Sequence, residues 1–144
     1  MKTLEMYNNI IAALCTWREA RGESATVQFL VAVSIVNRAK DASERWPKTL
    51  AGVVLQPKQF SSFNIGDRNA NKVPALNDAR FVSCCIAVDC ALAEGTLGQT
   101  MLLEDKYKPL LAANHYHDDS IAPPSWTKNM QYLGKVGRLL FYKG

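Results

Sequence analysis

Two glutamates, Glu19 and Glu23, lie four residues apart in the segment WREARGES, residues 17–24. A carboxylate at a helix end can be partly desolvated by the core while it still faces a cleft, and such burial raises its pKa as a general acid requires. Arg18 and Arg21 flank Glu19 and would lower that pKa if either paired with it. From the residues alone, Glu19 is either a proton donor or half of a structural ion pair.

Glu23 directly precedes Ser24, which is a candidate N-cap for the apolar segment that follows. A negative charge is favoured beside the free N–H groups of a helix N-terminus, so we expect a capping role for Glu23. The alternative is that Glu23 is the second carboxylate of a two-carboxylate glycosidase, a role for which Asp118 and Asp119 are further candidates.

His115 and His117 point to the same face of the chain if their segment is extended. With Cys84 or Cys90 they could be imagined as metal ligands, but a third ligand at diagnostic spacing is missing. We therefore expect no metal and no cofactor, and interpret both histidines either as groups that line a cleft or as structural residues. Four aromatic residues could stack on sugar rings or pack in the core: Trp46, Phe60, Tyr116 and Trp126.

The composition is that of one folded domain spanning residues 1–144, with 48% hydrophobic and 21% charged residues. The net charge of +4 attracts anionic partners weakly, and these include nucleic acid, anionic lipid and the acidic polymers of bacterial cell walls. Because the basic residues are scattered, no nucleic-acid patch is expected. The four cysteines lack the spacing of a zinc knuckle and the density of a disulfide scaffold, which predicts free thiols.

The apolar run over residues 10–15 is too short for the hydrophobic region of a signal peptide or for a membrane span. We therefore expect no export signal and no stable membrane association. If the target lies outside the cytoplasm, membrane permeabilisation or lysis would have to release the protein.

Helical periodicity is the main feature of the first half of the chain. Residues 3–21 predict an amphipathic helix with Thr3 as its cap, Gly22 as its stop and a buried stripe formed by Leu4, Tyr7, Ile10, Ile11, Leu14 and Cys15. A central helix, apolar on nearly every side, should follow Ser24 through Val36. A short helix is expected over residues 50–55, and a third long one from Leu76 or Asn77 to a stop at Gly95.

The remaining segments predict a small β region. Residues 59–64 alternate like a short strand, and residues 115–117 look extended. Residues 102–113 are expected to be helical or irregular with an interruption at Pro109, and residues 98–101 give no clear signal. Residues 131–142 predict a hairpin that turns near Gly134 or Gly137.

Four blocks in the chain resemble the catalytic domain of SleB/CwlJ-type cell-wall hydrolases, the spore-cortex-lytic family that also includes small phage endolysins. They are REARGE at 18–23, VNR at 36–38, PKQFS at 57–61, and NHYH at 114–117 followed by PSW at 124–126. The tail over residues 134–142 is similar to the closing segment of that family. The ordered set spans nearly the whole chain, so the resemblance is specific.

The resemblance implies an α+β, lysozyme-like domain, mainly helical with a small sheet or hairpin. It implies cleavage of peptidoglycan glycan strands between N-acetylmuramic acid and N-acetylglucosamine, with Glu19 as the catalytic acid. We lean to a lytic transglycosylase rather than a muramidase, because no second carboxylate has a convincing position. The expected groove residues are Gln59, Phe60, Ser61, His115, Tyr116, His117 and Trp126.

The chain has no room for a separate wall-binding domain, which is similar to a minimal phage endolysin. We expect such a protein to be a monomer that waits in the host cytoplasm until a holin opens the membrane. Two other classes remain open: a zinc-dependent peptidoglycan amidase using His115 and His117, and a non-enzymatic module that binds the wall or nucleic acid.

Overall fold

The structure is a computed structural model that describes residues 2–57, 59–75, 77–93 and 103–144. Its α-helices are α1 (Thr3–Ala20), α2 (Ala25–Lys40), α3 (Leu50–Leu55) and α4 (Ala79–Leu92). Its 3₁₀ helices are η1 (Ser61–Phe63), η3 (Asp105–Ala112) and η4 (Ser125–Asn129). Three strands, β1 (His115–Asp118), β2 (Gln131–Val136) and β3 (Leu139–Lys143), complete the fold.

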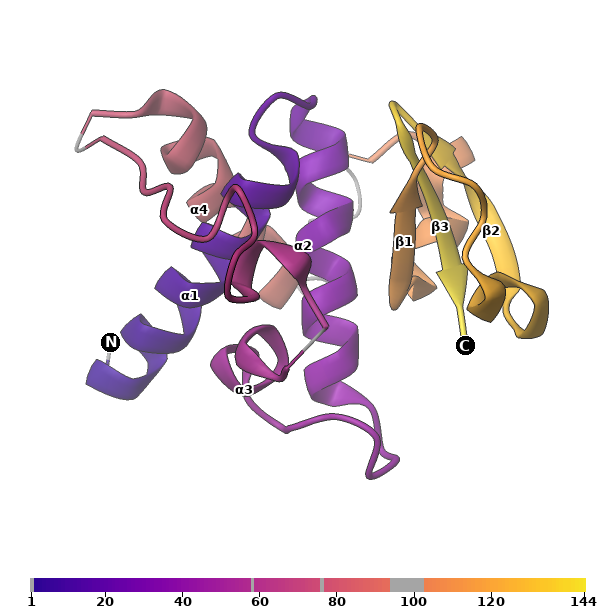
Figure 1. The fold of residues 1–144 in the computed structure, drawn as a ribbon, viewed down its shortest axis with the longest axis horizontal. Coiled ribbons are helices and arrows are strands. Elements are labelled where there is room, and N and C mark those ends of the chain that lie inside the picture. The colour runs from indigo at the N-terminus through magenta and orange to yellow at the C-terminus, as the bar shows by residue number, and fades with distance from the viewer. Residues whose placement is uncertain (1, 58, 76, 94–102) are drawn as a thin grey trace.

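The central element is α2, which has α1, α3 and α4 on one side and the sheet on the other (Figure 1). The helix-side core fills the space among the four helices, and it includes Cys15, Ile35, Val53 and Val88. The sheet-side core lies between α2 and the strands and includes Leu30 and Phe141. An all-round apolar helix was predicted for this segment, and its burial on both sides confirms that prediction.

Local capping signals set most helix starts. The Ser24 hydroxyl accepts a bond from the Val27 amide at 3.3 Å, and the Thr49 hydroxyl accepts one from Gly52 at 3.0 Å. Asp78 accepts from the amides of Arg80 and Phe81 at 2.8 and 3.2 Å, so α4 starts two to three residues later than predicted. The expected start at Leu76, the expected stop at Gly95 and residues 98–101 lie outside the described residues.

The first helix begins at Thr3 with Lys2 in the cap position, so Thr3 is not its cap. Of the predicted buried stripe, Cys15 is buried and Ile11 packs against the helix-side core, but Leu4, Tyr7 and Ile10 are 67%, 47% and 52% exposed. Apart from Trp17 and Arg18, the buried residues of the helix are small: Ala12, Ala13, Cys15, Thr16 and Ala20. Small side chains let a helix approach its neighbours closely, and α1 contacts α2, α3 and α4 at once. Apolar periodicity identified the helix but predicted only part of its buried face.

The sheet has the order β1-β3-β2 and is antiparallel throughout. The predicted hairpin is β2–β3, and it turns at Gly137, whose φ of +57° lies in the left-handed region that glycine adopts freely. A register shift between Tyr132 and Gly134 marks a bulge in β2. The prediction of an extended segment at 115–117 is confirmed by β1.

The predicted strand over residues 59–64 is wrong. Phe60 and Ser62 are buried while Gln59 and Ser61 are exposed, which is the alternation of a strand. The backbone instead turns, with bonds from Phe63 N to Phe60 O at 3.0 Å and from Asn64 N to Ser61 O at 2.9 Å. Alternating burial over so few residues does not distinguish a strand from a 3₁₀ turn packed on a core.

Within the described residues, the four cysteines are free thiols. None of the helices in those parts of the chain is long and apolar enough to cross a membrane.

Candidate active site

Glu19 lies in the last turn of α1 and is partly buried. The hydroxyl of Tyr116, on β1, donates a hydrogen bond to its Oε1 at 3.0 Å. Burial raises the pKa of Glu19, and the bond from Tyr116 works against that rise. The negative charge of Asp67 raises this pKa further, and the positive charge of Arg38 lowers it. Burial is the largest of these effects, so Glu19 holds its proton more tightly than an exposed glutamate.

Arg18 does not bind its neighbour Glu19. Its Nε donates to the carbonyl of Lys72 at 3.0 Å, and its Nη1 donates to the carbonyl of Ser62 at 3.2 Å. The guanidinium lies over the ring of Phe63, 4.5 Å from the ring centre. Arg18 therefore ties the loop over residues 62–72 to the end of α1.

Arg21, like Arg18, binds groups other than the Glu19 carboxylate. Its Nη1 donates to the carbonyl of Arg18 at 3.2 Å, and its Nη2 donates to Oδ1 of Asn69 at 3.3 Å. The guanidinium also lies over the ring of Trp17 at 4.8 Å. Among the described residues Glu19 takes part in no salt bridge. The ion-pair interpretation of Glu19 is thereby disfavoured, and the proton-donor interpretation remains.

Asp67 is a carboxylate that the sequence reasoning did not single out. It lies in the anchored loop, where its Oδ1 accepts a bond from the amide of Asn69 at 2.8 Å. Its charge acts on both Glu19 and Arg18, which places it on the same side of the domain. No local motif marks Asp67, since it reaches the site only because two arginines of α1 hold its loop.

Arg38 is a buried cation behind the site. Its Nε donates to the carbonyl of Asn114 at 2.7 Å, its Nη1 donates to Oε1 of Gln59 at 3.3 Å, and it lies 5.0 Å from the ring centre of Phe60. Burial lowers the pKa of Arg38 from its very high ordinary value. This residue links α2, the start of η1 and the start of β1, all of which surround Glu19.

The expected groove residues divide between the two faces of the sheet. Tyr116 faces Glu19 and packs against Phe141, with ring centres 5.9 Å apart. His115 and His117 point to the opposite face, where both rings lie close to Trp126. The structure thus brings Tyr116 to Glu19. It places His115 and His117 on the same face of the sheet, as predicted.

His115 lies between the rings of Trp46 and Trp126, at 5.7 and 5.3 Å. Its Nδ1 is 2.8 Å from Oδ1 of Asn114, which identifies Nδ1 as the protonated nitrogen of a neutral ring. Burial, with the nearby charges of Arg38 and Arg45, lowers the pKa of His115 to about 4. His115 is therefore uncharged at neutral pH.

His117 is buried, with its Nε2 3.0 Å from the Tyr142 hydroxyl and its Nδ1 3.0 Å from the carbonyl of Asp118. Both ring nitrogens are occupied by protein groups. In the described part of the chain, no group of three or more His, Cys, Asp or Glu is arranged to hold a metal ion. The geometry gives the zinc interpretation of His115 and His117 no support.

The block at 57–61 supplies both surface and core. Gln59 and Ser61 are exposed, whereas Phe60 is only 3% exposed and packs in the helix-side core. Phe60 therefore packs against Arg38 inside the protein, and its ring is too buried to stack on a sugar. Lys58 of the same block lies outside the described residues.

Two of the other carboxylates considered from the sequence, Asp118 and Asp119, have ion-pair partners of their own. Asp118 and Asp119 lie 3.3 and 3.6 Å from Arg138, and Asp119 also lies 3.0 Å from Lys135. The carboxylate of Glu23 lies against the hairpin turn at Gly137. None of the three acts on the pKa of Glu19, which distinguishes them from Asp67.

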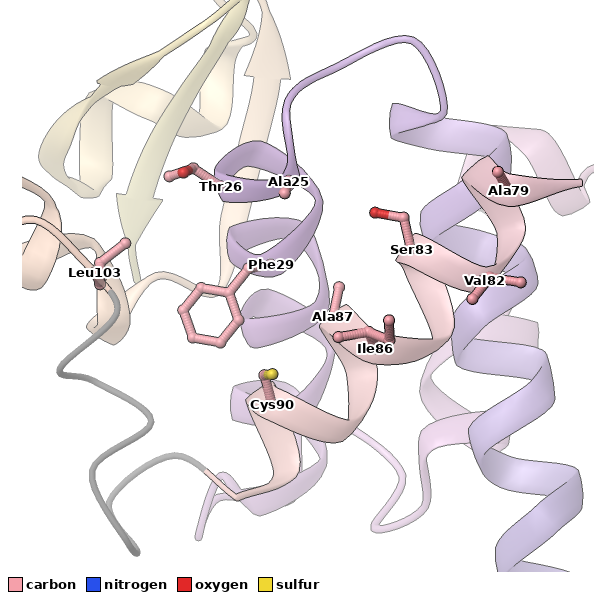
Figure 2. A pocket seen from close by; sticks show the side chains of 10 residues that line it. All are labelled: Ala25, Thr26, Phe29, Ala79, Val82, Ser83, Ile86, Ala87, Cys90 and Leu103. Carbon is pink, nitrogen blue, oxygen red and sulfur yellow. The ribbon is translucent and has the colours of Figure 1, made fainter.

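A separate hollow of about 450 Å³ lies between α2 and α4 (Figure 2). Its walls are mainly apolar, with Phe29 on α2 beside Cys90 on α4, and Val82 and Ile86 on α4 also line it. Glu19 is not part of its lining. The volume of this hollow is therefore no guide to the position of the candidate active site.

The chain belongs to the Cell Wall Hydrolase family, whose sequence model matches residues 22–142. The match begins three residues after Glu19, so the case for Glu19 as the acid rests on the geometry above and on the sequence block around it. Membership of this family makes the chain a cell-wall-degrading enzyme. No curated protein matches the chain.

Two solved structures share the fold. The catalytic domain of the germination-specific lytic transglycosylase SleB from Bacillus anthracis matches with a TM-score of 0.67 and 23% identity, covering 99% of this chain and 97% of that one. The catalytic domain of the Bacillus cereus SleB protein matches with a TM-score of 0.65 and 24% identity, covering 95% and 91%. The predicted α+β, mainly helical fold is confirmed.

Proposed function

We propose that this protein cleaves the glycan strands of peptidoglycan between N-acetylmuramic acid and N-acetylglucosamine, with Glu19 as the general acid. The observation that carries the proposal is that Glu19 is desolvated and hydrogen-bonded to Tyr116 while both neighbouring arginines bind backbone and loop groups. A carboxyl group in such surroundings remains protonated to a higher pH than an exposed one. Membership of the Cell Wall Hydrolase family supports the substrate class.

In the proposed reaction Glu19 transfers its proton to the glycosidic oxygen as the bond from C1 of the muramic ring to that oxygen breaks. Positive charge develops on the ring, and Glu19 is left as a carboxylate. The carboxylate then accepts the proton of the muramic 6-hydroxyl while that oxygen bonds to C1. The products are a 1,6-anhydro end and a free 4-hydroxyl, so no water is consumed and Glu19 regains its proton.

This lytic transglycosylase route needs one carboxylate, whereas a muramidase needs a second for water or for a covalent intermediate. The salt bridges of Asp118 and Asp119 favour the first route. The description of the Bacillus anthracis neighbour as a lytic transglycosylase supports it too. Asp67 is the candidate for the second carboxylate if the enzyme is hydrolytic. Mass spectrometry of digested peptidoglycan distinguishes the routes, because reducing ends in place of anhydro ends would reject the transglycosylase.

The acid is tested with Glu19→Gln, which keeps the shape of the side chain and removes the transferable proton. Loss of a general acid typically costs 10²–10⁴-fold in rate, so we expect at least a hundredfold slower release of muropeptides. Glu44→Gln, at an exposed position of the α2–α3 connection, is the matched control. A folded Glu19→Gln protein with wild-type activity would reject the assignment.

The same assay addresses the two other classes. A chelator would abolish the activity of a zinc amidase, and the released fragments would then carry free peptide ends. A binding module would associate with peptidoglycan without releasing soluble fragments. We expect soluble glycan fragments both with and without the chelator.

We also propose that the protein acts as a bacteriolytic endolysin, working as a monomer on the wall after release from the host cytoplasm through a holin-type lesion. The small single domain and its net charge of +4 support action on an acidic wall polymer. Production inside a bacterium, with and without a membrane-permeabilising agent, tests this setting. Lysis only after permeabilisation is the expected result, and lysis without it would argue against a holin-dependent role.

A further inference from the structure

Tyr116 reaches Glu19 from a different layer of the fold. Its backbone is paired with Phe141 of β3, and its ring lies against the Phe141 ring. The side chain packs against both the helix-side core and the sheet-side core. Packing therefore fixes the direction of the Tyr116 hydroxyl independently of the bond that it makes to Glu19.

We propose that Tyr116 is a positioning residue for the general acid: its hydroxyl holds Oε1 of Glu19, so that Oε2 carries the transferable proton. A protonated carboxyl group has one O–H and one carbonyl oxygen. Because the Tyr116 hydroxyl donates to Oε1 at 3.0 Å, Oε1 is the carbonyl oxygen. This inference rests on the proposed role of Glu19 and adds to it which of the two carboxyl oxygens transfers the proton.

Tyr116 donates in both states of the acid. Burial raises the pKa of Tyr116 well above its ordinary value, and the negative charge of Glu19 raises it further, so the phenol stays protonated. After Glu19 has given up its proton, the same bond stabilises the carboxylate charge. Oε2 is then free to accept the proton of the muramic 6-hydroxyl. Oε2 of Glu19 therefore both donates and accepts the proton during the reaction cycle.

The groups that face Glu19 come from every element packed around it. Asp67 of the anchored loop raises the pKa of Glu19, and Arg38 of α2 lowers it. Cys15, one turn earlier on α1, is an uncharged thiol whose own pKa burial raises well above its ordinary value. Of these neighbours, Tyr116 is the one whose hydroxyl donates a hydrogen bond to a carboxylate oxygen of Glu19, and that hydroxyl can be removed without changing any charge.

The test is Tyr116→Phe, which keeps the ring in the core and deletes only the hydroxyl. Without a donor to its carboxylate form, Glu19 holds its proton more tightly, and its pKa rises. We expect the alkaline limb of the pH–activity profile to move to higher pH. We also expect kcat to fall by about tenfold with an unchanged apparent KM, because the acid is less well oriented while glycan binding is not altered.

Tyr142→Phe is the matched control. It deletes the hydroxyl of a buried tyrosine on β3 that bonds His117 at 3.0 Å, on the face of the sheet away from Glu19. Its alkaline limb should stay at the wild-type pH. A direct measurement is the carbon-13 NMR titration of the Glu19 carboxyl carbon, which should shift to higher pH in Tyr116→Phe alone.

Three results would overturn the inference: an unmoved limb and titration in Tyr116→Phe, an equal shift in Tyr142→Phe, or a raised KM with kcat unchanged, which would make Tyr116 a glycan contact. Failure of the wider proposal looks different. If Glu19→Gln keeps wild-type activity, Glu19 is not the acid. If that variant is inactive while Tyr116→Phe has a wild-type profile, only the positioning role is rejected.

Discussion

Arg18 Nε and the carbonyl oxygen of Lys72 are 54 residues apart in the chain and 3.0 Å apart in space. The sequence neighbour of Glu19 is thus bound to a distant loop. This bond, with the second one to Ser62, explains how a glutamate flanked by two arginines avoids an ion pair that would hold it in its charged form.

Arg18→Lys should release the loop over residues 62–72. A lysine keeps the charge, but it cannot reach two carbonyls with the fixed fork of a guanidinium or lie flat over Phe63 in the same way. Losing one hydrogen bond to a charged group costs about 1.5–3 kcal/mol, and urea unfolding measures the loss. Arg21→Lys, whose bonds are longer at 3.2 and 3.3 Å, should cost less. Equal stability of Arg18→Lys and wild type would contradict the anchoring role.

The pH dependence of activity follows from the direction of the Glu19 shift. A general acid works in its protonated form, and burial raises the pKa of Glu19 above its ordinary value of 4.5. Activity should therefore persist to a higher pH than an exposed glutamate would allow, and then fall as pH rises through the raised pKa. Initial rates of peptidoglycan release across a pH series check this. A rate that keeps increasing into the alkaline range would be inconsistent with an acid role.

Gly137→Ala should destabilise the hairpin that closes over Glu23. The residue has a φ of +57°, and an added Cβ would lie 2.8 Å from Oε2 of Glu23. The left-handed conformation alone costs a non-glycine residue about 1–2 kcal/mol. Gly22→Ala is the control, because an added Cβ there meets nothing within 4 Å. Thermal unfolding should show a clear loss for the first variant and little for the second.

Acid should weaken the domain through His115. Its pKa is about 4 in the folded state against 6.5 for a free histidine, so the unfolded chain binds the proton more readily. Stability is complete above pH 6.5 and is lost progressively as pH falls from there towards 4. After allowance for solvent screening the loss should be about 1–2 kcal/mol.

His115→Phe keeps an aromatic ring between Trp46 and Trp126 and removes the titrating group. Its unfolding free energy should depend less on pH between 4 and 6.5 than that of the wild type. Identical pH dependence of the two proteins would show that His115 does not carry the effect.

The elements that the sequence predicts well are those with strong local signals. Ser24 caps α2 through its own side chain, as predicted, and Gly137 turns the hairpin because of its own φ. The predicted start of α4 missed the cap at Asp78. The face of α1 is not a local property. Its alanines are buried while Leu4, Tyr7 and Ile10 are exposed, because three other helices approach it, and periodicity within one segment does not indicate where those helices lie.

The candidate site shows the same limit. Glu19 could be singled out because a helix end and its charged neighbours are visible in the sequence, whereas Asp67 depends on a loop fixed by bonds across 48 and 54 residues. Grouping Tyr116 with His115 and His117 overlooked that neighbours in a strand face opposite sides. Alternation, applied to all three residues, would have separated Tyr116 from the two histidines.

The buried face of α1 has a further effect on Glu19. Alanine has no side-chain rotamers to lose on burial, and Ala12, Ala13 and Ala20 are each no more than 2% exposed. These alanines pack close to the helix backbone at little cost in side-chain entropy, whereas the buried side chains of Trp17 and Arg18 on the same helix are ordered on folding. The turn that carries Glu19 is thus held both by close backbone packing and by the two bonds of Arg18 to the loop.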